Sequence, residues 1–173
     1  MKRNNLFIIL AGFSDREMNK VEIVGFIGGK KFEDISEYFN SADVDVIVMD
    51  SMRVFGRNHV ISAMEHAERS FRNGTNRSKT IITEFLLYMA GERQISRALS
   101  TMKPKSEQGG IVAVFPNGVS KSVLEGSGMK RDDSVIDGTE EKAKVIGLSK
   151  NGLDVSYEDL VLEMVAMADV MKS

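Results

Sequence analysis

Short apolar runs alternate with longer amphipathic stretches along this chain, and the two patterns predict different elements. Runs rich in β-branched residues and bounded by Gly, Asn or Pro are typical of strands, whereas apolar positions three and four apart are typical of helices. The runs predict five strands, at residues 5–11, 21–27, 44–49, 109–116 and 144–148. The helical spacing predicts helices at residues 31–40, 57–72, 79–90, 119–126 and 157–171, with a further short helix between Gly91 and Pro104.

The connection between the first two predicted strands decides the fold class. It has only about ten residues, fewer than the dozen or so that a crossover between parallel strands needs. We therefore expect these two strands to pair antiparallel. Strands and helices are interleaved without strict alternation, so we predict an α+β fold. In this interpretation residues 1–173 form a single domain, with a mixed or mainly antiparallel sheet of about five strands covered by helices.

Local signals mark the ends of several helices. Ser78 and Ser156 precede apolar helical stretches, and a Ser oxygen in that position can accept a bond from one of the first free backbone N–H groups. Gly91 stands where a left-handed C-cap ends the central helix at low cost. Pro104 stops the short helix that follows, because Pro cannot continue a helix. Residues 127–142 are rich in Asp and Glu and are predicted to form a flexible acidic loop.

Composition adds mainly exclusions to this picture. A chain of 173 residues can bury a substantial core, and the absence of Cys excludes disulfides, thiolate metal sites and a Cys nucleophile. No apolar run approaches the roughly 20 residues that a spanning helix needs. No small-residue cleavage pattern follows the first apolar run, so we expect no signal peptide and a cytoplasmic protein.

The distribution of charge is more informative than the net charge of −2. Residues 53–105 carry ten Lys and Arg against four Glu, so the middle of the chain is basic and the remainder is acidic. Such a segment can form a positive surface for a polyanion. The same charges can equally be the solvated outer faces of helices, and charge alone does not separate the two interpretations.

The two His residues, His59 and His66, do not form a metal site by their spacing. Seven residues on one helix correspond to two turns, or about 10 Å along the axis, which is too far for one ion to reach both. No His-Glu-x-x-His pattern occurs, and no Gly-x-Ser-x-Gly frames a catalytic Ser. We expect both His side chains to be at the surface or half buried.

Two further stretches match binding motifs only in part. Residues 25–31 resemble a phosphate loop but lack its glycine spacing and the Ser or Thr after Lys, so a hairpin or a turn at a strand end is expected. Asp133 and Asp137 suggest a calcium loop, but Val135 takes a ligand position and Lys144 stands where a Glu is required. The sequence therefore predicts no catalytic residue, no metal and no cofactor.

The central stretch, residues 77–99, offers recognition chemistry instead. Each helix start presents free N–H groups and a partial positive charge, which attract an anion. Arg93 can form a forked contact with a phosphate, and Gln94 can bond a base edge or a sugar hydroxyl. The alternative is that Arg93 pairs with Glu84 or Glu92 and holds two helices together.

Residues 79–99 closely resemble the central motif of the Cgi/TPRKB family, a subunit of the KEOPS complex. The Lys-Thr start, the Glu-x-x-Leu-Tyr core and the Gly-x-Arg-Gln-Ile corner carry the resemblance. Chain length, the lack of Cys and the order of elements agree with that family, and residues 132–136 resemble its polar connection before the last strand. Outside residues 77–99 the likeness lies more in element order than in identical residues.

The resemblance implies a non-catalytic subunit that binds and stimulates the Bud/PRPK kinase-ATPase. It also implies a role in recruiting tRNA, through the 3′ CCA end, for threonylcarbamoyladenosine modification, with other KEOPS subunits contacted indirectly. Single-stranded ends are gripped by backbone charge contacts and by stacking. The candidates for this grip are Arg77, Lys79, Arg93 and Gln94, with Ile95 as an apolar platform.

The last helix is the candidate surface for the kinase. Its apolar residues exceed a single stripe, and Met suits adaptable interfaces. The candidates are Val161, Met164, Met167 and Met171, for each of which core packing is the alternative. Two other functions stay open: an interaction adaptor without a nucleic-acid role, and a small-molecule enzyme whose pocket would gather Asp50, His59 and Glu84.

Overall fold

The computed structural model describes residues 8–9, 20–105 and 109–171. The chain folds into two compact units. We call the described parts of Met1–Ser51 and Lys103–Val135 the sheet unit, and Met52–Met102 with the described part of Ile136–Ser173 the helical unit. Single turns of 3₁₀-helix, η1 (Ser51–Arg53) and η2 (Asp133–Ile136), lie where the chain passes from one unit to the other. No helix of the described residues is long and apolar enough to cross a membrane.

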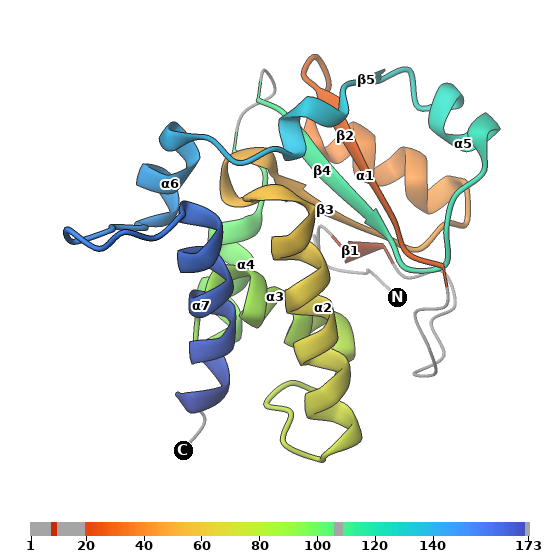
Figure 1. Ribbon diagram of the computed structural model, residues 1–173. Coiled ribbons are helices and arrows are strands. Elements are labelled where there is room, and N and C mark those ends of the chain that lie inside the picture. The colour runs from red at the N-terminus through yellow and green to blue at the C-terminus, as the bar shows by residue number, and fades with distance from the viewer. Residues whose placement is uncertain (1–7, 10–19, 106–108, 172–173) are drawn as a thin grey trace. The chain divides into compact units, whose positions relative to one another are not determined.

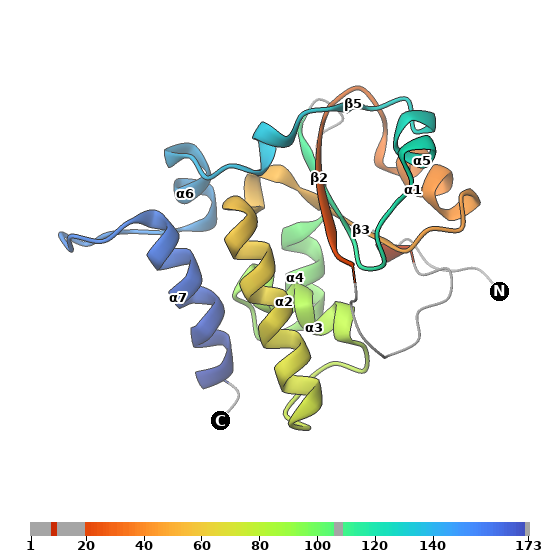
Figure 2. The ribbon, with the colours of Figure 1, turned by 45° about the vertical axis from the view of Figure 1, so that its right-hand side comes forward.

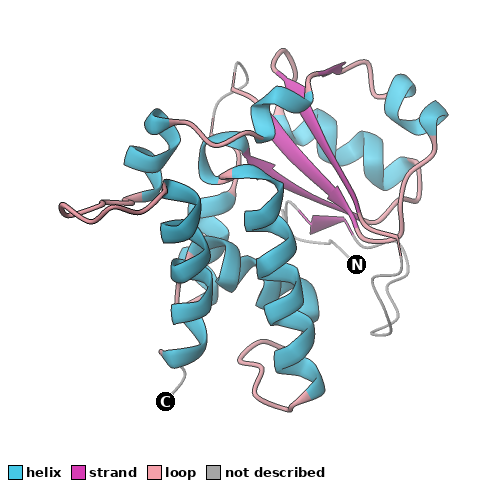
Figure 3. Cartoon of the chain, viewed as in Figure 1, coloured by secondary structure: helices cyan, strands magenta, loops and turns pink. Residues whose placement is uncertain are grey.

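All the strands of the described residues belong to the sheet unit and form one antiparallel sheet (Figures 1 and 3). The strands occur in the order β1-β3-β4-β2-β5, and each neighbouring pair is antiparallel. Their bounds are β1 Ile8–Ile9, β2 Glu22–Ile27, β3 Val46–Asp50, β4 Ile111–Phe115 and β5 Lys130–Arg131. The predicted α+β class and the mainly antiparallel sheet of about five strands are therefore confirmed.

The predicted pairing of the first two strands is wrong. β1 pairs with β3, and β2 pairs with β4 and β5, so two strands separate β1 from β2. The short connection excludes a parallel crossover, but it does not require adjacent strands. Ten extended residues can reach about 33 Å, whereas three strand spacings amount to only about 15 Å.

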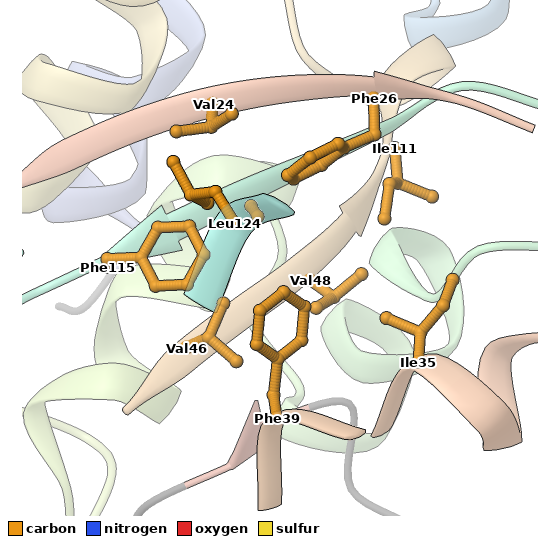
Figure 4. Packing of buried hydrophobic residues seen from close by; sticks show 10 residues of the cluster. Val24, Phe26, Ile35, Phe39, Val46, Val48, Ile111, Phe115 and Leu124 are labelled. Carbon is orange, nitrogen blue, oxygen red and sulfur yellow. The ribbon is translucent and has the colours of Figure 1, made fainter. Parts of the chain in front are cut away.

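One face of the sheet packs against α1 (Phe32–Ser41) and α5 (Lys121–Gly126), which Figure 2 shows on the same side of the strands. Alternate residues of β2, β3 and β4 point into this core, because successive strand side chains face opposite ways. Figure 4 shows Phe39 of α1 beside Phe115 of β4, with ring centroids 5.5 Å apart in a T-shaped arrangement. The core residues are Val24, Phe26, Ile35, Phe39, Val46, Val48, Ile111, Ala113, Phe115 and Leu124.

The helical unit consists of α2, α3, α4, α6 and α7. Their bounds are α2 Gly56–Arg72, α3 Ile81–Ala90, α4 Ile95–Met102, α6 Glu140–Ile146 and α7 Tyr157–Val170. α7 lies alongside α2, and a hydrogen bond of 2.6 Å from Asn58 Nδ2 to Glu158 Oε1 joins their first turns (Figure 1). Ser156 and Asp159 form a reciprocal capping box at the start of α7, which confirms the predicted cap.

The segment from residue 127 to residue 148 differs from its prediction. The expected acidic loop contains β5, η2 and the start of α6, and residues 144–146 of the expected last strand form the end of α6. Thr139 Oγ1 accepts a bond from Lys142 N, two Glu follow in the first turn, and Gly147 closes the helix with φ +90°. These capping signals specify a helix, although the apolar run inside it is too short to show a period.

Candidate functional site

The start of α3 is organised by a buried carboxylate. Glu84 is 1% exposed and accepts bonds from the backbone N–H groups of Arg77 and Ser78, both at 2.9 Å, and from Ser78 Oγ at 2.8 Å. Ser78 is therefore buried beside Glu84 and does not cap the helix as predicted. Thr80 takes the cap position instead, and its Oγ1 accepts from Thr83 N at 3.2 Å. The backbone of Arg77 and Ser78, just before α3, is therefore held by hydrogen bonds to Glu84.

This arrangement changes the interpretation of the first predicted anion site. Arg77 is half buried and lines a small depression with Glu84, Leu87, Tyr88, Glu92 and Ala168. Lys79 is exposed. A phosphate approaching this helix start would meet the carboxylate of Glu84, and two negative charges at close range repel. Of the two residues, only Lys79 is fully accessible to a ligand.

The second predicted site, at the start of α4, is open. Arg93, Gln94 and Ile95 are all exposed, and Ile95 shows 38% of its surface. Gly91 ends α3 with φ +61°, which confirms the predicted left-handed cap, and Gln94 O accepts the first α4 bond, from Ala98 N at 3.0 Å. Three candidate recognition residues therefore follow one another on one exposed corner.

The alternative interpretation of Arg93 as a structural ion-pair residue does not hold within the described part of the chain. Glu84 bonds to Ser78 and Arg77, and Glu92 pairs with Arg97 at 3.5 Å. Among the described residues Arg93 takes part in no ion pair, so its guanidinium group is available to a ligand.

The two helix starts do not form one corner. They lie at opposite ends of α3, whose 10 residues span about 15 Å along the helix axis. The structure therefore brings Arg93, Gln94 and Ile95 together and places Lys79 a helix length away. A ligand that contacts both starts must be extended over about 15 Å.

α7 carries apolar residues on every side. Val161, Val165 and Ala168 are buried within the helical unit, and Val161 packs with Phe55 and Ala143. The prediction that Val161 contacts the kinase is therefore wrong, because no partner can reach this side chain without unfolding the unit. Met164 is half buried and packs over Gly91, where an added Cβ would lie 2.7 Å from its Cγ.

The outer surface of α7 is the accessible part. Met167 is 44% exposed, Met171 is half buried, and Val170, which the sequence analysis did not single out, is 62% exposed. Ile61 on the neighbouring α2 is 45% exposed and was likewise missed as a surface residue. The sequence did contain a signal for Val170: it lies outside the apolar stripe of α7 that faces the other helices. A helix packed on one side needs only one such stripe, so an apolar residue beyond it is expected at the surface.

A polar cluster fastens α7 to α2 and α3. Asp169 accepts from Tyr88 Oη and from Arg69 at 3.0 Å, and its Oδ2 lies 2.7 Å from Nδ1 of His66. The His66 side chain is 15% exposed, as expected for a half-buried His. These contacts link three helices and fix which face of α7 points outward.

His59 differs from its prediction because it is fully buried. Its Nδ1 accepts from Phe55 N, and its Nε2 bonds Met89 O, both at 3.1 Å, so the neutral ring carries its proton on Nε2. Burial is the main reason why the pKa of His59 is lowered to about 4; the bond to Met89 opposes this shift, and the Lys142 charge adds to it. His59 and Glu84, two residues of the enzyme alternative, are thus engaged in structural bonds.

The two partial motifs also have structural roles. Gly28 and Gly29 lie between β2 and α1, which confirms a turn at a strand end. Asp133 Oδ1 accepts from Gly25 N at 2.9 Å, and its Oδ2 pairs with Arg131 at 2.8 Å. Gly25 is needed there, since a Cβ would lie 2.4 Å from Asp132 O. Among the described residues no three His, Asp or Glu are grouped to hold a metal.

Comparison with known proteins adds the family. Residues 26–169 match the family model described as kinase binding protein CGI-121. The matched range includes both predicted helix starts and nearly all of α7. A search among curated proteins finds no significant match to the chain.

Proposed function

Because the chain belongs to the CGI-121 family of kinase binding proteins, we propose that it is a non-catalytic KEOPS subunit. In this proposal it binds and stimulates a kinase-ATPase of the Bud/PRPK class and helps to recruit tRNA by its 3′ CCA end. The observation that carries the proposal is the exposed apolar surface of α7 in a protein whose family binds a kinase.

The kinase part follows from the surroundings of α7. A helix packed on one side needs only one apolar stripe, yet α7 also carries Met167 and Val170 on its exposed side. Every large apolar side chain found exposed in the described residues belongs to the helical unit. Exposed apolar surface is typical of a protein–protein interface. The kinase therefore covers the outer face of α7, with Met167 and Val170 at its centre and Met164 and Met171 at its margin.

A matched pair of variants tests this surface. Val170→Asp should reduce co-purification with the kinase at least about tenfold, because burying an unpaired charge costs more than the about 1.4 kcal/mol that a tenfold loss requires. Leu153→Asp is the control: Leu153 is 61% exposed and Val170 62%, and Leu153 lies outside α7. If both variants retained the kinase equally, the proposal that α7 forms the kinase interface would be refuted.

The tRNA part is supported by the corner formed by Arg93, Gln94 and Ile95. The Arg guanidinium supplies a forked phosphate donor, Gln an amide for a base edge, and Ile an apolar contact for a base face. Lys79, about 15 Å away along α3, contacts the strand further along its backbone. Arg77 lies beside Glu84 and contributes positive charge more than a direct contact.

The test uses equal charge changes at two places. Arg93→Glu should weaken tRNA binding, whereas Lys144→Glu, an exposed change on α6, should leave it nearly unchanged. Wild-type affinity should fall with rising salt, because phosphate contacts release counterions, and it should fall again when the CCA end is removed. Unchanged binding by the folded Arg93→Glu protein would refute this site.

An adaptor without a nucleic-acid role is the second candidate. The separation of the two helix starts and the carboxylate of Glu84 at one of them favour it, because both reduce the positive charge offered at a single place. Kinase binding together with negligible tRNA binding at low salt would select this function.

A further inference from the structure

The sheet unit contains a pocket that none of the residues proposed above for kinase or tRNA binding line. Its volume is about 220 Å³, and it lies between the end of β2, the start of α1, the segment after α4 and the start of β4. Phe26, Ile35 and Ile111 line its floor but are at most 5% exposed, whereas its other apolar lining residues, Ile27, Phe32 and Met129, are half buried. The apolar surface that a ligand can reach therefore belongs mainly to Ile27, Phe32 and Met129.

The rim of the pocket is positively charged. Among the described residues that line it are Lys30, Lys103 and Lys105, against a single acid, Glu33. Lys103 Nζ lies 5.2 Å from the centre of the Phe32 ring, which holds the ammonium group at the mouth by a cation–π contact. Within the described residues neither Lys103 nor Lys105 forms an ion pair, so both charges are available to an anion.

Hydrogen bonds hold one wall of the pocket in place. Lys30 Nζ donates to Ser127 O at 2.6 Å, and Met129 N donates to Ser127 Oγ at 3.2 Å. Ser127 is itself 1% exposed, and its Oγ donates to Leu124 O. Lys30 thus ties the turn after β2 to the segment that carries Met129, and the pocket keeps its shape without a ligand.

Size and charge together select a class of ligand. An apolar cavity of about 150 Å³ accepts a benzene molecule, so 220 Å³ holds one ring with a small substituent. Pockets for larger, drug-sized molecules begin at about 300 Å³. We infer that this pocket binds a small anion with one apolar ring, whose ring lies against Phe32 and Met129 and whose anionic group lies between Lys103 and Lys105.

Three probes, each added to the 173-residue chain, separate the two parts of this inference. Phenyl phosphate carries both ring and anion, benzyl alcohol only the ring, and inorganic phosphate only the anion. Backbone amide NMR shifts should saturate with phenyl phosphate and should be largest at Gly28, Gly109 and their neighbours. Binding of either single-feature probe should be at least about tenfold weaker, since each lacks one of the two contacts.

Variants then test the residues. Lys103→Met and Lys105→Met keep the side-chain stem and remove the charge, so each should weaken phenyl phosphate binding by about tenfold. Lys121→Met is the control, because Lys121 is exposed on α5 and pairs with Glu125, away from the pocket lining. The amide spectrum also reports whether each variant is folded.

Three results would overturn the inference. They are the absence of saturable shifts in the wild type, equal binding by Lys103→Met, Lys105→Met and wild type, and equal affinity for phenyl phosphate and benzyl alcohol. A titration with AMP then distinguishes two kinds of natural ligand. AMP binding as strong as that of phenyl phosphate indicates that the natural ligand is a nucleotide, and weaker binding indicates that it is a smaller free metabolite.

Discussion

Gly91 is the left-handed C-cap of α3 and also lies against Met164 of α7. Replacing it by Ala therefore adds a backbone conformational cost and a packing cost, which suitable controls can separate. The backbone at Gly91 has φ +61°, and a Cβ would lie 2.7 Å from Met164 Cγ and 3.0 Å from its Sδ. The left-handed conformation costs a non-Gly residue about 1 kcal/mol, and overpacking costs about 2 kcal/mol. Gly91→Ala should therefore destabilise the protein by about 3 kcal/mol.

Gly147→Ala is the control for the conformational part. Gly147 ends α6 with φ +90°, and nothing lies within 4 Å of its Cβ position. Its φ is further from the left-handed minimum near +57° than that of Gly91. The backbone penalty of Gly147→Ala is therefore at least as large as that of Gly91→Ala. Gly147→Ala should lower the free energy of unfolding by only about 1 kcal/mol. The remaining difference of about 2 kcal/mol between the two variants then measures the overlap of the new Cβ with Met164.

The assay is urea unfolding followed by far-UV circular dichroism, which reports mainly the helical unit. Thermal melting gives a second measure: about 3 kcal/mol corresponds to about 6–12 °C in a chain of this size. In a Met164→Ala background the contacting atoms are gone, so Gly91→Ala should cost only about 1 kcal/mol there. Equal losses for Gly91→Ala and Gly147→Ala would refute the packing of Met164 on Gly91.

Further predictions concern pH, the buried carboxylate and a missed cap. His59 has a folded pKa of about 4, below its ordinary 6.5. The unfolded chain therefore binds the proton first, and the free energy of unfolding should fall by up to about 3 kcal/mol as pH drops from about 6.5 to about 4, with a shallower slope in His59→Leu. Glu84→Gln should cost about 1–3 kcal/mol in urea unfolding, because the N–H groups of Arg77 and Ser78 lose a charged acceptor; no loss would contradict the role of Glu84. Thr139→Ala should lower the unfolding free energy by about 1 kcal/mol and reduce the amide exchange protection of α6, and unchanged protection would contradict the cap.

Local chemistry along the chain determined most of the elements. β2, β3, β4, α1, α2 and α5 lie within two residues of their predicted bounds. Gly91 and the Ser156 cap were predictable because each depends on a few neighbouring backbone groups. α6 carried readable caps as well, but its short apolar run fits a strand equally well. The predicted strand at residues 5–11 lies mostly outside the described residues.

The tertiary structure decided which residues can take part in recognition. The sequence shows Glu84 as one of several acids, Val161 as one of many apolar residues of α7, and His59 as a surface candidate. Their burial depends on segments distant in sequence, as do the strand order and the exposure of Val170. Helical and strand periods report which residues share a face, because they arise from the local backbone geometry. Which face is covered, and by what, follows from long-range packing that no local pattern encodes.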